Sequence, residues 1–221
     1  MGNPTDTRGL VHRRIGPRSA GMSMRPDEFD ALPPTAFDDR YRYEVIRGTL
    51  VVSPFPGNAE SDPNDDLGHL LRTYQETDPR GHLLDRTIPE RTVPGTPNRR
   101  RCDRAIWAGL GRLPDTDHDV PAIVVEFVSA RKRDVFRDYE EKRDEYLAAG
   151  VREYWVIDRF RRTLTVYRPG LEGPDALVVT EDRTYESPLL PGFTLPLARL
   201  LAAADAWRKR RRNGPKKGTE P

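Results

Sequence analysis

Cysteine, histidine and long hydrophobic runs are scarce in this chain of 221 residues. A single cysteine, Cys102, excludes an intrachain disulfide, and with only four scattered histidines it argues against a four-ligand zinc site. No apolar run approaches the roughly 20 residues of a membrane-spanning helix, and the N-terminus lacks the hydrophobic segment of a secretory signal. A glycine-rich phosphate loop and a Gly-x-Ser-x-Gly motif are also missing. We therefore expect a cytoplasmic protein with no membrane partner.

Charge is distributed unevenly along the chain. The net charge is +2, but residues 208–221 carry seven basic residues and one acidic residue. The other 207 residues therefore hold 30 basic and 34 acidic groups. Any affinity of this body for nucleic acid must come from local patches or from the tail. We favour a solvated, disordered tail, with phosphate contact as the alternative.

The hydrophobic pattern predicts an α/β domain with a mixed sheet and flanking helices. We expect a disordered tail over residues 1–25, one domain over 26–203, and the end of the last helix with its basic tail over 204–221. A polar loop is expected over Ser53–Asn64. The expected strands are 41–46, 49–52, 82–88, 100–108, 122–128, 153–158, 163–168 and 176–180, and the main helices are 65–77, 134–149 and 197–210.

Three polar residues stand inside otherwise apolar elements. Asp103 lies in the strand Cys-Asp-Arg-Ala-Ile-Trp, and Glu126 lies in the run Ala-Ile-Val-Val-Glu-Phe-Val. Lys142 falls on the apolar stripe of the helix at 134–149. Buried ionised groups need a partner or a metal ion. Two carboxylates and a lysine that converge would suit metal-assisted phosphodiester cleavage.

Each of these residues also has a purely structural interpretation. Glu126 could pair with one of the many arginines, and Lys142 could extend from the edge of its stripe to solvent. Glu44, between Tyr43 and Val45 in the first hairpin, could supply a third carboxylate. Taken alone, Glu44 is better explained as an edge-strand charge.

The order and spacing of several motifs resemble the Uma-type endonucleases, members of the restriction-endonuclease-like PD-(D/E)xK superfamily. The motifs are Tyr-Glu-Val-Ile-Arg-Gly-Thr-Leu from residue 43, Cys-Asp at 102, Val-Glu-Phe-Val-Ser at 125, Glu-Tyr-Trp-Val-Ile-Asp at 153 and Ser-Pro-Leu-Leu-Pro-Gly-Phe at 187. The resemblance covers roughly residues 26–203. It implies a restriction-endonuclease-like mixed sheet flanked by helices, with an N-terminal hairpin and a C-terminal helix.

The resemblance also implies roles for single residues. Asp103 and Glu126 match the two metal-binding acids, and Glu44 matches the family's N-terminal acid. The usual lysine two residues after the second acid is replaced by Val128, and Lys142 on the following helix takes its place. Cys102 stands where a proline usually precedes the first acid, so the strand there could be shifted.

The resulting hypothesis is a Mg²⁺- or Mn²⁺-dependent DNA endonuclease. Arg101, Arg131, Lys132 and Arg133 flank the acid-bearing strands and are candidates for DNA phosphate contacts, although such clusters are often only solvated loops. A homodimer stays open, because nucleases that cut both strands often pair two sites. The alternative is an inactive nuclease-fold module that binds nucleic acid or a protein partner.

Overall fold

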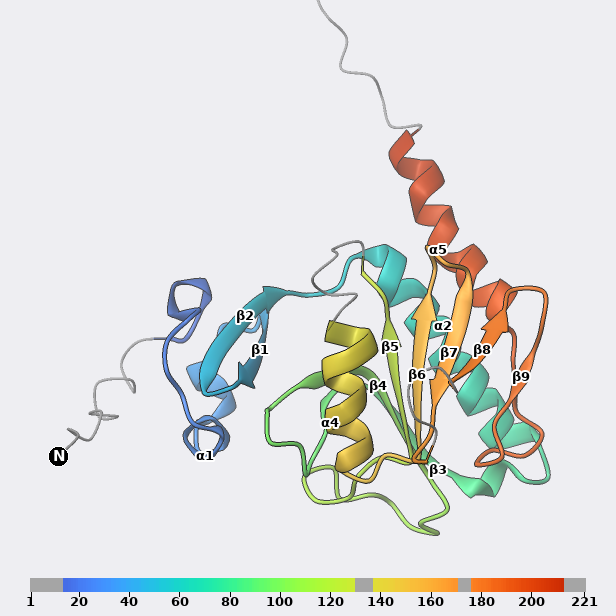
Figure 1. Ribbon diagram of the computed structural model, residues 1–221, viewed down its shortest axis with the longest axis horizontal. Coiled ribbons are helices and arrows are strands. Elements are labelled where there is room, and N and C mark those ends of the chain that lie inside the picture. The colour runs from blue at the N-terminus through green and yellow to red at the C-terminus, as the bar shows by residue number, and fades with distance from the viewer. Residues whose placement is uncertain (1–13, 130–136, 171–175, 213–221) are drawn as a thin grey trace, which may run out of the picture. The chain divides into compact units, whose positions relative to one another are not determined.

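The computed structural model describes residues 14–129, 137–170 and 176–212 (Figure 1). The chain divides into two compact units. The first contains residues 1–55 together with Pro97–Arg100, and the second contains residues 56–96 and 101–221. Within the described ranges, no helix combines the length and the apolar character that crossing a membrane requires.

The first unit is built around an antiparallel hairpin of β1 (Tyr41–Ile46) and β2 (Thr49–Pro54). Its two-residue turn is Arg47-Gly48, and both residues have positive φ, 51° and 72°. This backbone is what the tight hairpin turns that match strand twist require, so the predicted hairpin is confirmed. The short elements α1 (Pro26–Asp30), η2 (Pro17–Ser19) and η3 (Pro34–Ala36) complete the unit.

Residues 14–25 differ from the expected disordered tail. Ile15 is 1% exposed and forms a β-bridge with Phe37, while Met24 is 2% exposed. Both side chains belong to the small hydrophobic core of the hairpin. The Gly- and Pro-rich composition hid these two apolar anchors, because they are too far apart to form a periodic pattern.

The second unit contains a six-stranded sheet with the order β3-β4-β5-β6-β7-β8. Only β5 and β6 run parallel, and every other neighbouring pair is antiparallel. The predicted mixed sheet is therefore confirmed. Its strands are β3 (Leu84–Thr92), β4 (Arg101–Ala108), β5 (Ile123–Phe127), β6 (Glu153–Asp158), β7 (Thr163–Tyr167) and β8 (Leu177–Thr180).

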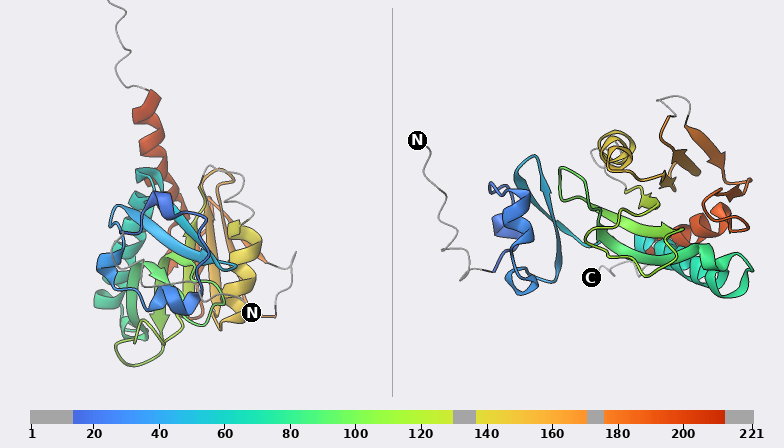
Figure 2. Two further views of the ribbon diagram at one scale, coloured as in Figure 1. Left: turned by 90° about the vertical axis from the view of Figure 1, so that its left-hand side faces the viewer. Right: turned by 90° about the horizontal axis from the view of Figure 1, so that it is seen from below.

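Helices cover both faces of this sheet (Figure 2). On one face lies α4 (Lys142–Ala148), which continues from a π-helical turn, η5 (Arg137–Glu141). On the other face lie α2 (Asn58–Thr77) and α5 (Leu197–Arg212). Each face has its own buried hydrophobic cluster. The remaining elements are η4 (Gly81–Leu83), β9 (Tyr185–Glu186) and β10 (Thr194–Leu195).

The expected loop over Ser53–Asn64 is wrong for most of its length. Helix α2 begins at Asn58, seven residues before the predicted start, and contains Pro63. Pro63 and Asn64 are buried, so tertiary packing holds this turn in spite of the lost amide hydrogen. The early start places Glu60 in the first helical turn.

Candidate active site

The two central carboxylates come from neighbouring strands. Ala105 of β4 lies opposite Val124 of β5, and side chains two residues apart share a face of the sheet. Asp103 and Glu126 therefore project from the same face, the one that α4 covers. They are only 7% and 2% exposed. Asp103 Oδ2 accepts a hydrogen bond of 2.7 Å from the backbone N–H of Phe127. Because Phe127 directly follows Glu126, this bond places the Asp103 carboxylate next to the Glu126 backbone.

Lys142 is the first residue of α4, the helix that covers this face of the sheet, and its side chain extends to this pair. Its Nζ lies 2.8 Å from Glu126 Oε1 and donates a 3.2 Å hydrogen bond to the Arg101 carbonyl. One helical turn later, the Tyr146 hydroxyl donates to the same Glu126 oxygen at 3.3 Å. Lys142 is 2% exposed, so the ion pair is buried. The structure thus brings together Asp103, Glu126 and Lys142. The alternative that the Lys142 side chain extends to solvent is wrong, because the side chain is buried.

The opposite face of β4 holds Asp103 in position. Asn64 of α2 donates to the Asp103 carbonyl at 2.8 Å and accepts from Arg104 Nε at 2.7 Å. Arg104 also donates to the Thr87 hydroxyl, and burial lowers the pKa of Arg104 to about 10. Its guanidinium lies so close to α2 that a Cβ at Gly68 would come within 2.6 Å. This fixed network sets the backbone from which Asp103 projects.

Cys102 does not contribute a nucleophile to the site. The thiol is fully buried, and burial together with the Glu126 carboxylate raises the pKa of Cys102 far above its ordinary value. A thiol in this state stays protonated and unreactive. Cys102 instead fills the hydrophobic cluster beneath α4.

The other predicted residues lie outside this cluster or outside the described residues. Glu44 is buried in β1 of the first unit, opposite Val51, and its role stays a prediction. Arg101 donates to the Glu90 carbonyl at 2.5 Å, which gives its guanidinium a local partner, and its DNA contact also stays a prediction. The predicted contacts at 131–133 lie outside the described residues.

The donor set can be tested against the implied metal ion. In the described ranges, no group of three or more His, Cys, Asp or Glu residues is placed to hold a metal. Asp103 and Glu126 form a pair of buried carboxylates, which are hard oxygen donors. Mg²⁺ is usually held by one or two carboxylates, with water and substrate oxygens in its other positions. The pair therefore fits Mg²⁺ or Mn²⁺ at a substrate-completed site better than a closed structural site.

Comparison with known proteins identifies the family. The family model described as "Uma2: Putative restriction endonuclease" matches residues 26–198. The chain belongs to the Uma2 family. A crystal structure of a "putative nuclease belonging to DUF820" from Anabaena variabilis has a similar fold, with a TM-score of 0.63 at 19% identity. The similarity covers 80% of this chain and 97% of that chain. No curated protein matches the sequence.

Sequence reasoning about this Uma2 protein missed three polar residues near the site. Tyr146 lies four residues after Lys142 on the same helical stripe, and this spacing places the two side chains next to each other. Its contact with Glu126, the partner of Lys142, follows from that neighbourhood. Glu60 and Arg159 form an ion pair of 2.8 Å at the ends of α2 and β6. No sequence signal links two residues 99 positions apart.

Proposed function

We propose that this Uma2 protein is a Mg²⁺- or Mn²⁺-dependent endonuclease that hydrolyses DNA phosphodiester bonds. The observation that carries the proposal is the convergence of Asp103, Glu126 and Lys142 from three separate elements, with Lys142 Nζ 2.8 Å from Glu126 Oε1. Family membership and the shared nuclease fold support the same reaction class.

Each residue has a distinct part in this proposal. Asp103 and Glu126 would hold the metal ion, which when bound supplies positive charge and acidifies a bound water. Lys142 would orient the attacking water and neutralise the charge that develops on the phosphate oxygens. The Tyr146 hydroxyl positions the Glu126 carboxylate, and the Arg101 carbonyl positions the Lys142 ammonium. The buried setting strengthens each of these interactions, because little water screens them.

The test is nicking of supercoiled plasmid with Mn²⁺ by the wild type and by Glu126→Ala. We expect the wild type to nick and the variant to lose the activity. Glu76→Ala, which removes an exposed glutamate of α2, is the control and should nick like the wild type. Equal nicking by wild type and Glu126→Ala would overturn the assignment.

A second candidate is a nuclease-fold module that binds nucleic acid or a protein without turnover. The observation in its favour is that Lys142 already neutralises Glu126, so the pair is stable as a buried structural ion pair. Calorimetric titration with Mn²⁺ separates the two functions. Binding that depends on Asp103 supports the enzyme, and no binding supports the module.

A further inference from the structure

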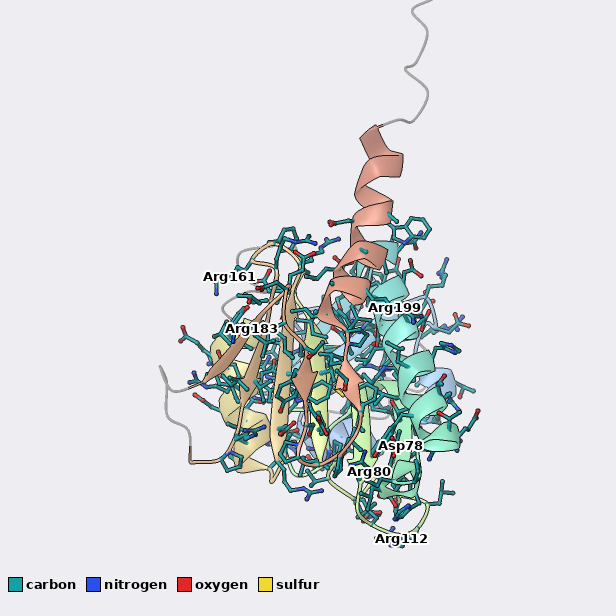
Figure 3. The ribbon with its side chains drawn as sticks, turned by 90° about the vertical axis from the view of Figure 1, so that its right-hand side faces the viewer. Asp78, Arg80, Arg112, Arg161, Arg183 and Arg199 are labelled. Carbon is teal, nitrogen blue, oxygen red and sulfur yellow. The ribbon has the colours of Figure 1, made fainter. Side chains whose placement is uncertain are left out.

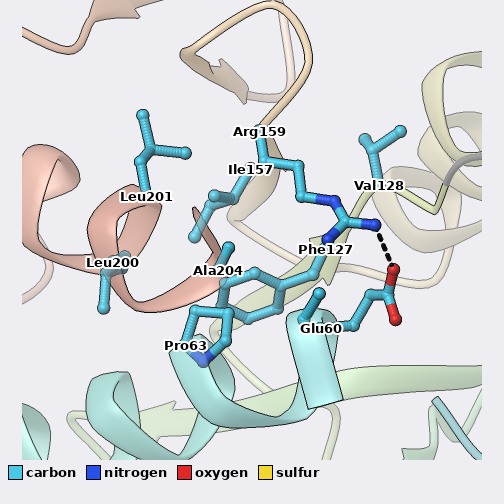
Figure 4. A pocket seen from close by; sticks show the side chains of 10 residues that line it. Glu60, Pro63, Phe127, Val128, Ile157, Arg159, Leu200, Leu201 and Ala204 are labelled. Carbon is cyan, nitrogen blue, oxygen red and sulfur yellow. Dashed lines mark hydrogen bonds and ion pairs between the residues drawn. The ribbon is translucent and has the colours of Figure 1, made fainter. Parts of the chain in front are cut away.

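A small pocket opens at the carboxyl ends of β5 and β6 (Figure 4). Its apolar wall includes Phe127, Val128, Ile157, Leu200, Leu201 and Ala204. The only charged side chains in its lining are Glu60 and Arg159. The enclosed space of about 10 Å³ has room for roughly one water-sized group, such as a single phosphate oxygen.

The Arg159 guanidinium is only partly used inside the protein. One terminal nitrogen lies 2.8 Å from Glu60 Oε1, and the side chain is 14% exposed. Its Nε is buried and, within the ranges that the structure describes, donates to no acceptor. A buried charged donor without an acceptor is destabilising. An acceptor from outside the chain would remove this penalty.

Arg159 lies at the same end of the parallel strands as the candidate active site, and its pocket is lined from α2 and α5, on the face of the sheet opposite α4. Glu126 of β5 is paired with Val156 of the parallel strand β6, and Arg159 directly follows the end of β6 at Asp158. Ligands of open α/β sheets bind at the carboxyl ends of parallel strands.

Electrostatics link Glu60 of the pocket to one of the two carboxylates, Asp103. Burial raises the pKa of Glu60, Arg159 acts in the opposite direction, and the negative charge of Asp103 raises it further. Glu60 therefore lies within electrostatic reach of Asp103. The Arg159 cation in turn lies where an approaching phosphate would be attracted.

We propose that Arg159 is a phosphate-binding residue for the DNA strand at this site, and that Glu60 holds its guanidinium in place until the DNA arrives. The inference rests on the proposed function. A backbone phosphate next to the cleaved one would accept from the planar guanidinium, whose fork matches phosphate oxygens better than a lysine does. Glu60 then competes with the phosphate for the same cation.

The experiment measures binding of a short fluorescein-labelled DNA duplex by anisotropy, with Ca²⁺ in place of Mg²⁺, across a salt series. The variants are Arg159→Gln, Glu60→Gln and the control Arg112→Gln. Arg112 also pairs with a single carboxylate, that of Asp119. Within the second unit, Figure 3 labels Arg112 at the bottom and Arg161, two residues after Arg159, well above it. The wild type and all three variants are measured by anisotropy and are also assayed for plasmid nicking with Mn²⁺.

We expect Arg159→Gln to weaken binding about tenfold and to reduce the salt slope by about one. Glu60→Gln should tighten binding by about threefold, because it frees the cation and removes a negative charge. An effect of Arg159→Gln no larger than that of Arg112→Gln would overturn the inference. If Arg159→Gln does not fold, unchanged or weaker binding by Glu60→Gln overturns it. A wild type that binds DNA but never nicks would refute the proposed function instead.

Discussion

Two buried glutamates on neighbouring strands, Glu126 of β5 and Glu153 of β6, have opposite surroundings. Glu153 is 1% exposed and is surrounded by donors alone. Its Oε1 accepts from Arg168 and Tyr185 at 2.9 Å each, and its Oε2 accepts from Ser187 at 2.8 Å and Trp155 at 2.9 Å. With both oxygens hydrogen-bonded, the Glu153 carboxylate connects the segments that contain Arg168, Tyr185 and Ser187 to strand β6.

Glu126 is as deeply buried but lies next to a second carboxylate, Asp103, with one ammonium group between β5 and α4. Placing like charges together is unfavourable unless a cation compensates. Burial alone therefore does not separate a structural acid from a functional one. The separation comes from the partners, which are donors only around Glu153 and include another acid at Glu126.

The largest contrast is expected for the isosteric changes Glu126→Gln and Glu153→Gln. Glu126→Gln should lower the plasmid nicking rate about 1,000-fold, which is about 4 kcal/mol of transition-state stabilisation, because the metal loses a charged ligand. Glu153→Gln should nick within about twofold of the wild type per folded molecule. Similar losses in both variants would erase the contrast.

The stability of the fold should depend strongly on Glu153. Glu153→Gln breaks the charge pair with Arg168 and turns an amide N–H₂ toward existing donors, so we expect it to lose about 3 kcal/mol of unfolding free energy. Urea denaturation followed by tryptophan fluorescence measures this loss. A Glu153→Gln protein as stable as the wild type would show that the donor cluster contributes little.

The cations Lys142 and Arg168 should show the same contrast as Glu126 and Glu153, the carboxylates with which they pair. Lys142→Gln should lower the nicking rate about 100-fold, or about 2.7 kcal/mol, because charge on the phosphate is no longer neutralised. Arg168→Gln, the matched change at the structural cluster, should leave nicking intact and lower the melting temperature. Normal nicking by a folded Lys142→Gln protein would show that Lys142 has no part in catalysis.

The smallest effect concerns the pH dependence of stability at Glu60. Its pKa is raised from the ordinary 4.5 in the folded state, mainly by burial, so the folded protein binds this proton more tightly than the unfolded chain. The contribution of Glu60 to stability is therefore fully present below pH 4.5 and is lost as pH rises through the folded pKa. Glu60→Gln should show a flatter melting-temperature profile as pH rises above about 4.5. A profile parallel to that of the wild type would contradict the raised pKa.

The sequence predicted the sheet and the trio because both depend on local patterns. Continuous apolar runs identify buried strands, and alternation together with helical spacing puts Asp103, Glu126 and Lys142 on inward faces. The start of α2 was missed because Pro63 inside its first turns, and Pro56 and Gly57 just before it, mimic a loop, and the burial of Pro63 and Asn64 is not visible in the local pattern. The Glu60–Arg159 pair was missed because a contact between residues so far apart in the chain leaves no trace in local spacing.

Calorimetric titration of Mn²⁺ into the wild type, Glu126→Gln and Glu153→Gln tests the contrast between the two glutamates most directly. We predict one binding event in the wild type, its loss in Glu126→Gln and its retention in Glu153→Gln. Binding that survives in Glu126→Gln, or a wild type that binds no Mn²⁺, would contradict the assignment of Asp103 and Glu126 as the metal-holding pair.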